Sequence, residues 1–274
     1  MPHYVSKGLA RFAPGLALKD SPSPTAYIAP NYGAEVQFET DDNSPLAIPD
    51  EKVWVQQVNG YFLYYARVQK SLMHPACNDI SATQANPTAN TVKAAWRLLI
   101  YLSNHPDHTV MYTACEMILK VYSDASYNSR PGSISIAGGW HYCGNSLTIP
   151  SMVPYIASAV VSLPSVVLFP KPNTLPFSYI NGTAAAWEHT VLASLGYPQH
   201  PIVLITDNEC AAGIANNKLT ACKSKKIAMR YHWIRCRIRL DEFQCKWLPG
   251  KLNYADFFTK NLPVFEFEQY ESIY

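Results

Sequence analysis

The spacing of apolar residues predicts two helices in the first half of the chain. Apolar residues recur at positions i, i+3, i+4 and i+7, namely Ala95, Leu98, Leu99 and Leu102. This period is typical of an amphipathic helix, and Thr91 is a candidate for its N-cap. A second helix is expected to begin near Pro49 and to continue towards Tyr65, because a proline followed by acidic residues suits a first turn.

From residue 109 onwards the pattern changes to short β-prone runs and further helices. Three strands, as in an antiparallel meander, are expected at Val110–Tyr112, Met117–Tyr122 and Ile134–Tyr142. They are followed by a helix at Ala184–Leu195, a buried strand at Ile202–Ile205, a helix at about Lys225–Arg239, a strand at Phe243–Trp247 and the start of a last helix at Asn253–Phe258. The succession βββαβαβα predicts an α/β fold with a mixed sheet flanked by helices.

Prolines and glycines interrupt every periodicity in the first part of the chain. We therefore expect residues 1–48 to form an extended arm or linker, and residues 49–108 to form a helical segment. Residues 109–265 are expected to form the α/β domain, with a degenerate proline-rich insert at residues 160–180, and residues 266–274 an acidic tail. A chain of 274 residues that is 48% hydrophobic can bury the core of one domain plus a smaller module.

The cysteines and the apolar runs exclude several classes of protein. The seven cysteines are odd in number and never stand at two-residue spacing, which argues for reduced thiols and against a zinc site or a disulfide framework. The longest apolar run, Ile156–Phe169, is interrupted by Pro164 and is too short to span a bilayer. The first residues lack the apolar stretch of a secretory signal. We expect an intracellular protein, cytoplasmic or nuclear, without a membrane partner.

Three aspartates stand in short motifs at expected ends of strands or starts of helices. They are Asp124 in Val121–Tyr127, Asp207 in Ile205–Asn208 and Asp256 in Asn253–Lys260. Such positions can converge in an α/β domain, and carboxylate oxygens are the ligands that Mg²⁺ and Mn²⁺ prefer. A lone aspartate after a strand is more often a turn or helix cap. The metal interpretation therefore depends on all three side chains meeting.

Positive charge is concentrated in one segment. No acidic residue occurs between Lys218 and Arg239, and this asymmetry indicates a polyanion such as nucleic acid. The candidates for phosphate contacts are Lys223, Lys225, Lys226, Arg230 and Arg235. The same residues also suit a solvated helix face, and the sequence leaves both interpretations open.

Four motifs follow one another in a recognisable order: Ser123–Tyr127, Thr206–Asn208, Met229–Arg235 and Ala255–Lys260. In this order, residues 120–263 resemble the ribonuclease H domain of copia-type retrotransposon polyproteins. The stretches Gly33–Gln37 and Gln56–Arg67 resemble the region between the polymerase and nuclease domains. The resemblance implies a ribonuclease H-like mixed five-stranded sheet flanked by helices, with an N-terminal extended arm and a helical connection segment. The chain has no Tyr-x-Asp-Asp polymerase motif, so the polymerase part of a reverse transcriptase is a candidate partner.

The resemblance also implies a reaction, the metal-dependent hydrolysis of RNA in an RNA·DNA hybrid. Such a site uses two Mg²⁺ or Mn²⁺ ions roughly 3.5 to 4 Å apart. Carried over to this chain, Asp124 bridges both ions, Asp207 holds one of them with Asp124, and Asp256 completes the second site. The family's fourth ligand, a Glu that opens the helix after the third strand, is missing, because no acidic residue occurs between Asp124 and Glu188.

We expect hydrolysis to be weak or absent for this reason. Prolines between Val160 and Pro176 argue against a regular helix there, and Glu188 stands about fourteen residues beyond the expected ligand, roughly 20 Å along a helix. A frameshift that removed the Glu and an ordinary proline-rich insertion both explain the gap. Two alternatives to the nuclease stay open: a noncatalytic nucleic-acid-binding or interaction module, and a retroelement relic without function.

Overall fold

The computed structural model divides the chain into two compact units, which we call the helical unit (Met1–Val110, Arg130–Gly132 and Lys260–Tyr274) and the sheet unit (Met111–Ser129 and Ser133–Thr259). The residues that the structure describes are 1, 3–15, 21–27, 29, 42–106, 108–110, 114–130, 134–145, 156–162, 175–217, 225–260 and 262–271. The helical unit contains α1 (Tyr4–Phe12), α2 (Pro49–Val68), the 3-10 turn η1 (Ser71–Met73), α3 (His74–Thr83), α4 (Ala89–Asn104) and α8 (Val264–Glu271).

Helix α1 corrects the prediction of an arm without regular structure, which is wrong for residues 4–12. Val5, Gly8 and Phe12 are buried at helical spacing, and the prolines that suggested an irregular chain come only after this segment. The helix packs on α2, where the ring of Tyr4 stacks on that of Tyr61 with centroids 4.4 Å apart. A short amphipathic helix is thus stabilised by tertiary packing rather than by its own propensity.

The two helices predicted from apolar spacing are confirmed. Helix α2 begins at Pro49, as expected, and α4 buries Ala95, Leu98, Leu99 and Leu102. The cap of α4 is Thr88, however, and not Thr91. The backbone N–H of Thr91 donates to the Thr88 hydroxyl, and the Thr91 hydroxyl accepts from the backbone N–H of Thr88. This reciprocal capping box satisfies two donors at the helix start.

Most of the predicted acidic tail forms helix α8, whose residue Phe267 is buried. In this helix Glu271 accepts hydrogen bonds from the Lys70 ammonium at 3.5 Å and from the Tyr101 hydroxyl at 3.1 Å. Burial lowers the pKa of Lys70 below its ordinary value, while Glu271 opposes this shift. The C-terminal helix therefore supplies the counter-charge for a buried lysine of the helical unit.

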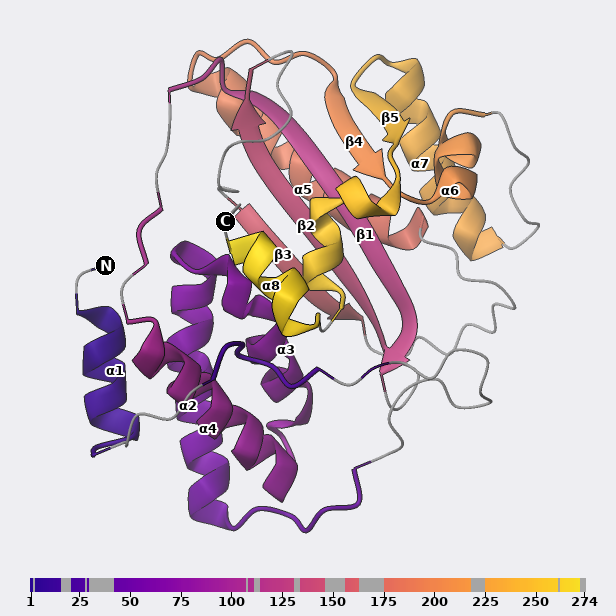
Figure 1. Cartoon of the computed structure of the whole chain (residues 1–274). Helices are drawn as coiled ribbons and strands as arrows, with labels where there is room; N and C mark the ends of the chain where they lie inside the picture. The colour runs from indigo at the N-terminus through magenta and orange to yellow at the C-terminus, as the bar shows by residue number, and fades with distance from the viewer. Residues whose placement is uncertain are drawn as a thin grey trace. The chain divides into compact units, whose positions relative to one another are not determined.

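The sheet unit contains five strands in the order β3-β2-β1-β4-β5 (Figure 1). They are β1 (Ile118–Arg130), β2 (Ile134–Gly144), β3 (Ile156–Ser162), β4 (Ile202–Thr206) and β5 (Phe243–Trp247). Strand β4 pairs in parallel with β1 and with β5, whereas β2 and β3 pair in an antiparallel manner. The sheet is therefore mixed, as the sequence predicted.

The first strands differ from the prediction. Val110 lies outside any strand, and the rest of the strand expected at Val110–Tyr112 falls outside the described residues. The third antiparallel strand is instead β3, which pairs Val160 with Ala137. In the sequence, the alanines and serines of this segment obscured its β character, although its isoleucine and two valines are β-branched residues, which are typical of strands.

The helices of the sheet unit are α5 (Leu175–Ser194), α6 (Glu209–Ala215) and α7 (Lys225–Arg239), with the 3-10 turns η3 (Gly250–Leu252) and η4 (Tyr254–Phe258). Helix α5 begins at Leu175 rather than at Ala184, so the expectation that prolines forbid a helix is wrong from this residue onwards. Pro176 falls in the first turn, where its missing N–H is not needed. Residues 163–174 lie outside the described part of the chain.

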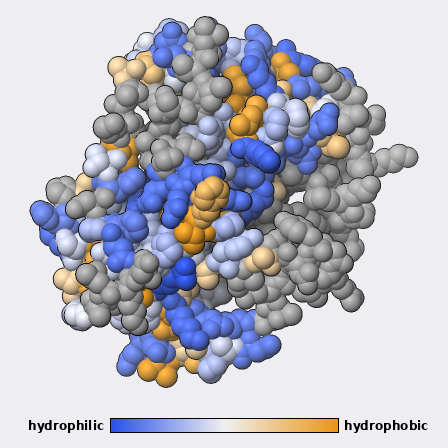
Figure 2. All heavy atoms as spheres, in the orientation of Figure 1, coloured by the Kyte–Doolittle hydropathy of each residue, from blue (hydrophilic) through white to orange (hydrophobic). Residues whose placement is uncertain are grey.

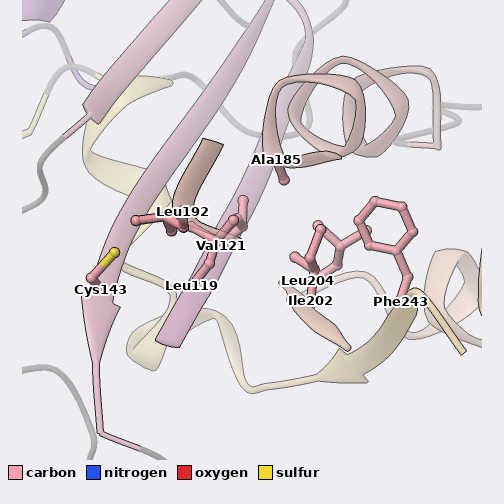
Figure 3. Close-up of a cluster of buried hydrophobic side chains, with 8 residues drawn as sticks. All are labelled: Leu119, Val121, Cys143, Ala185, Leu192, Ile202, Leu204 and Phe243. Atoms are coloured by element: carbon pink, nitrogen blue, oxygen red, sulfur yellow. The ribbon is translucent and has the colours of Figure 1, made fainter. Parts of the chain in front are cut away.

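The core of the sheet unit lies between α5 and the sheet (Figure 3). Strands β1, β2, β4 and β5 and helix α5 contribute to it. The buried residues are Leu119, Val121, Cys143, Ala185, Leu192, Ile202, Leu204 and Phe243. Burying each large apolar side chain stabilises the fold by roughly 1.5–3 kcal/mol. This packing fixes the paired strands β1 and β4, and Asp124 lies within β1 while Asp207 directly follows β4.

In the face shown in Figure 2, hydrophilic residues predominate and hydrophobic ones form small separate patches among the described residues. None of the helices in the described part of the chain is both long and apolar enough to cross a membrane.

Candidate metal centre

The pairing of β1 with β4 brings two of the predicted acids together. Ser123 lies opposite Thr206 in the parallel register, so the next residue of each strand segment, Asp124 and Asp207, projects from the same end of the pair. Asn208 then caps α6 by accepting from the backbone N–H of Ala211 at 2.8 Å. The turn from β4 into a helix therefore fixes the direction in which the chain leaves the site.

The third acid, Asp256, is placed by the packing of η4 on β2. Gly138 makes this contact possible, because a methyl group there would lie 2.8 Å from the Ala255 carbonyl oxygen and 2.8 Å from the Thr259 methyl group. Asn253 begins the turn by accepting from the backbone N–H of Ala255 at 3.2 Å. The predicted helix start at Asn253–Phe258 is thus a 3-10 turn.

The three aspartates meet as the sequence predicted. Asp124 is buried, and Asp207 and Asp256 are half-buried. One carboxylate oxygen from each lies within 4.8 Å of the others. Like charges at this separation repel each other, and a divalent cation among them relieves the repulsion. The donor set, all carboxylate oxygen, fits Mg²⁺ or Mn²⁺.

Strand β1 continues past Asp124 to Arg130, beyond the predicted end at Tyr122. Three hydrogen bonds that the sequence did not predict hold the middle of this strand. Thr259 donates its hydroxyl to a carboxylate oxygen of Asp124. On the preceding residue, Asn181 of α5 donates to the Ser123 hydroxyl at 2.9 Å, and Asn253 donates to the Ser123 carbonyl at 3.2 Å. Each buried hydrogen bond contributes about 1 kcal/mol and restricts the position of the strand. The threonine and asparagine of the Asn253–Lys260 motif were the available signal.

Glu188 does not belong to the acid cluster among the described residues. Its carboxylate lies 2.8 Å from Nδ1 of His141, a buried residue of β2. The side chains of the first turns of α5, before Asn181, lie outside the described part of the structure. The sequence contains no other acid between Asp124 and Glu188.

The predicted phosphate-binding residues are only partly described. Lys223 lies outside the described residues, and so do the side chains of Lys225, Lys226 and Arg230, although their backbone forms the first half of α7. Arg235 donates from Nε to the Ile214 carbonyl at 2.8 Å and so links α7 to α6. Its role in phosphate binding stays a prediction.

The strand order and the pairing directions define a fold of the mixed α/β class, in which three acids meet beside the paired strands β1 and β4. By sequence, the chain is similar to the retrovirus-related Pol polyprotein from transposon TNT 1-94 of Nicotiana tabacum, with 25% identity over 214 residues. The match covers 75% of this chain and 15% of the polyprotein. The predicted resemblance to copia-type polyproteins is confirmed as a distant similarity. No family model matches the chain.

Solved structures of other proteins are also distantly similar to this chain. The structure of LC11-RNase H1, isolated from compost, has 12% identity and a TM-score of 0.39, and the match covers 52% of this chain and 93% of that chain. The foamy viral protease-reverse transcriptase in complex with dsDNA has 13% identity and a TM-score of 0.47, with coverage of 77% and 40%.

Proposed function

We propose that the sheet unit is a copia-type ribonuclease H domain that binds RNA·DNA hybrids with the help of Mg²⁺ or Mn²⁺ and cleaves them slowly or not at all. The observation that carries the proposal is the approach of the three aspartates, whose ligand oxygens lie within 4.8 Å of one another. Asp124, Asp207 and Asp256 would hold the ions. Bound divalent ions supply an activated water and stabilise the charge on the leaving oxygen.

The residues around the acids support a site held ready for a metal. Thr259, with its hydroxyl on Asp124, limits the rotation of that carboxylate. Asn181 and Asn253 fix the neighbouring Ser123 from two sides. A ligand whose position is set before binding loses little conformational entropy when the ion arrives.

Impaired hydrolysis is proposed because the set of acids is incomplete. The family uses four, and this chain has no acid between Asp124 and Glu188. Glu188 is engaged by His141. With one carboxylate fewer, the second ion is held by less negative charge, so we expect it to bind weakly. A noncatalytic hybrid-binding module is the second candidate, favoured by the same missing acid.

We also propose that residues 49–108 form a connection segment and residues 109–265 the ribonuclease H-like domain, preceded by residues 1–48, which include helix α1, and followed by residues 266–274, which include most of helix α8. The sequence similarity to the polyprotein supports this division, because it extends over 214 residues and so beyond a single nuclease domain. The polymerase part of a reverse transcriptase is the proposed partner of the connection segment. Such a partnership places the protein in the cytoplasm or the nucleus.

A cleavage assay tests this proposal. The purified chain and its Asp124→Asn variant are incubated with Mg²⁺ or Mn²⁺ and an end-labelled RNA·DNA hybrid, and binding and cleavage are followed separately. We expect metal-dependent binding in the unaltered chain, weaker binding in the variant, and little cleavage in either. Rapid cleavage that Asp124→Asn abolishes would overturn the proposed impairment. Binding that ignores both the metal and the substitution would overturn the metal centre.

A further inference from the structure

The end of β5 carries an exposed aromatic residue directly beside the acid cluster. Trp247 is 49% exposed, and Leu252, at the end of the turn that follows, is 53% exposed. Trp247 pairs with Thr206 in the parallel register of β5 and β4. It therefore stands next to the strand end from which Asp207 projects.

Two close approaches fix this segment against Asp207. The indole N–H of Trp247 donates to the Asp207 backbone carbonyl at 2.9 Å. In the turn, a methyl group on Gly250 would lie only 3.4 Å from a carboxylate oxygen of Asp207. The polar edge of the indole is thus satisfied by the protein, while about half of the side chain faces solvent. An anchored ring of this kind loses little freedom when a ligand packs on it.

The charges around Trp247 indicate what such a ligand is. Lys246 precedes Trp247 in β5 and therefore projects to the other face of this strand, whereas Lys251 lies in the turn η3, and both lysines are exposed. In the part of the chain that the structure describes, neither lysine forms an ion pair. Exposed aromatic rings between lysines are typical of surfaces that bind single strands of nucleic acid, where a base stacks on the ring and the lysines neutralise phosphates.

We propose that Trp247, Lys246 and Lys251 form a stacking platform for one nucleic-acid strand at the edge of the metal centre. A base stacks on the indole, and the ammonium groups of Lys246 and Lys251 contact phosphates of the same nucleic-acid strand where it passes the outermost strand β5. The platform holds the strand beside Asp207. This inference rests on the proposed function for the nature of its occupant, but it requires neither a bound metal nor hydrolysis.

The described contacts support a nucleic-acid contact more directly for Trp247 than for the basic helix α7. The hydrogen bond from the Trp247 indole to the Asp207 carbonyl holds the platform beside the acids. In α7, the described contact of Arg235 is made to the protein itself, at the Ile214 carbonyl. The position of Trp247 therefore gives the sharper prediction of a nucleic-acid contact.

Binding of a short oligonucleotide tests the platform without catalysis. A fluorescently labelled single-stranded RNA and the matching RNA·DNA hybrid are titrated with the full chain in EDTA, so that hydrolysis does not compete. Since stacking of one base contributes about 1–3 kcal/mol, we expect Trp247→Ala to weaken binding about 10-fold and Trp247→Phe to weaken it less. The matched control is Trp187→Ala, which removes a more exposed tryptophan, 68% exposed, from α5 and is expected to leave the affinity unchanged.

Two further measurements separate the platform from other causes. Oligonucleotide binding is expected to quench tryptophan fluorescence in the unaltered chain, and this quenching should be lost in Trp247→Phe. The double variant Lys246→Gln, Lys251→Gln is expected to show a smaller salt dependence of the binding affinity. Equal affinities for the unaltered chain and Trp247→Ala, or no binding by the unaltered chain, would overturn the platform. Mn²⁺ affinity, measured on the same proteins without nucleic acid, reports on the metal centre alone, so failure of one proposal is distinguished from failure of the other.

Discussion

The two units place charged groups inside the protein in opposite ways. In the helical unit, the Lys70 side chain is 2% exposed and lies 3.5 Å from Glu271, and its ammonium group lies 4.7 Å from the centroid of the Tyr101 ring. In the sheet unit, Asp124, Asp207 and Asp256 bring charges of one sign within 4.8 Å. A buried cation matched by a carboxylate is complete as a structural element. Carboxylates gathered together repel one another, and a bound divalent cation relieves this repulsion, so the sheet unit is the candidate for binding a metal.

The side chains around Lys70 and those around the three aspartates also have different effects. Around Lys70 the neighbours lower the energy of a charge that folding has buried. Around the aspartates the neighbours hold the acids in place: Thr259 contacts Asp124 directly, and Asn181 and Asn253 hold Ser123. Such contacts act on position more than on charge. They are what a metal site needs before the metal binds.

The largest effect is expected from Gly138→Ala, which should break the acid cluster and leave the helical unit intact. The new methyl group meets a backbone oxygen, that of Ala255, at 2.8 Å, and η4 has to move to relieve the clash. Overpacking of this kind costs about 1–3 kcal/mol and occasionally more. Urea unfolding followed by circular dichroism should show the loss of stability, and Mn²⁺ affinity should fall because Asp256 shifts.

Gly60→Ala is the matched control for that substitution. Gly60 lies within α2, and nothing lies within 4 Å of a methyl group placed there. The alanine should therefore stabilise the helical unit by roughly 0.5–1 kcal/mol. Equal effects of the two substitutions on Mn²⁺ affinity would contradict the assignment of Asp256 to the cluster.

An effect that is confined to the helical unit and leaves the acid cluster unchanged is expected from acid. Burial, with a contribution from Arg67, lowers the pKa of His74 from 6.5 to about 4. Between these values the unfolded chain binds a proton that the folded chain does not, so stability falls as the pH falls from 6.5 towards 4. The full loss is about 3 kcal/mol at one site, from the shift in pKa. Hydrogen exchange of the α3 amides at several pH values measures it.

His74→Gln provides the control for the acid effect. Glutamine does not titrate, so the stability of the variant's helical unit should change less over the same pH range. If α3 in the variant loses protection as steeply as in the unaltered chain, another group is responsible for the acid sensitivity.

Periodic and local signals explain what the sequence could predict. Helix α4 was recognised because its apolar residues repeat at helical spacing, and β4 because four apolar residues stand between turn formers. The meeting of Asp124 and Asp207 was expected from places at the ends of strands, which is correct for Asp207 but wrong for Asp124, because β1 continues to Arg130. These features depend on residues close together in the chain.

Features that depend on distant packing were missed. Helix α1 is held by aromatic contacts with α2. Strand β3, in which four of the seven residues are alanine or serine, is placed by its pairing with β2. The start of α5 was predicted too late because Pro176 was taken as a helix breaker, although a first turn tolerates it. Likewise, nothing local in the sequence predicts that Asn181 of α5 donates a hydrogen bond to Ser123 of β1.

The central claim, that the three aspartates form one metal site, is tested most directly by a Mn²⁺ titration observed by NMR on the isotope-labelled chain. The paramagnetic ion broadens the signals of nuclei near it. The account predicts that low Mn²⁺ concentrations broaden the amide signals around Asp124, Asp207 and Asp256 together, and that Asp124→Asn strongly reduces this effect. Signals that stay sharp at all three positions, or broadening unchanged by the substitution, would contradict it.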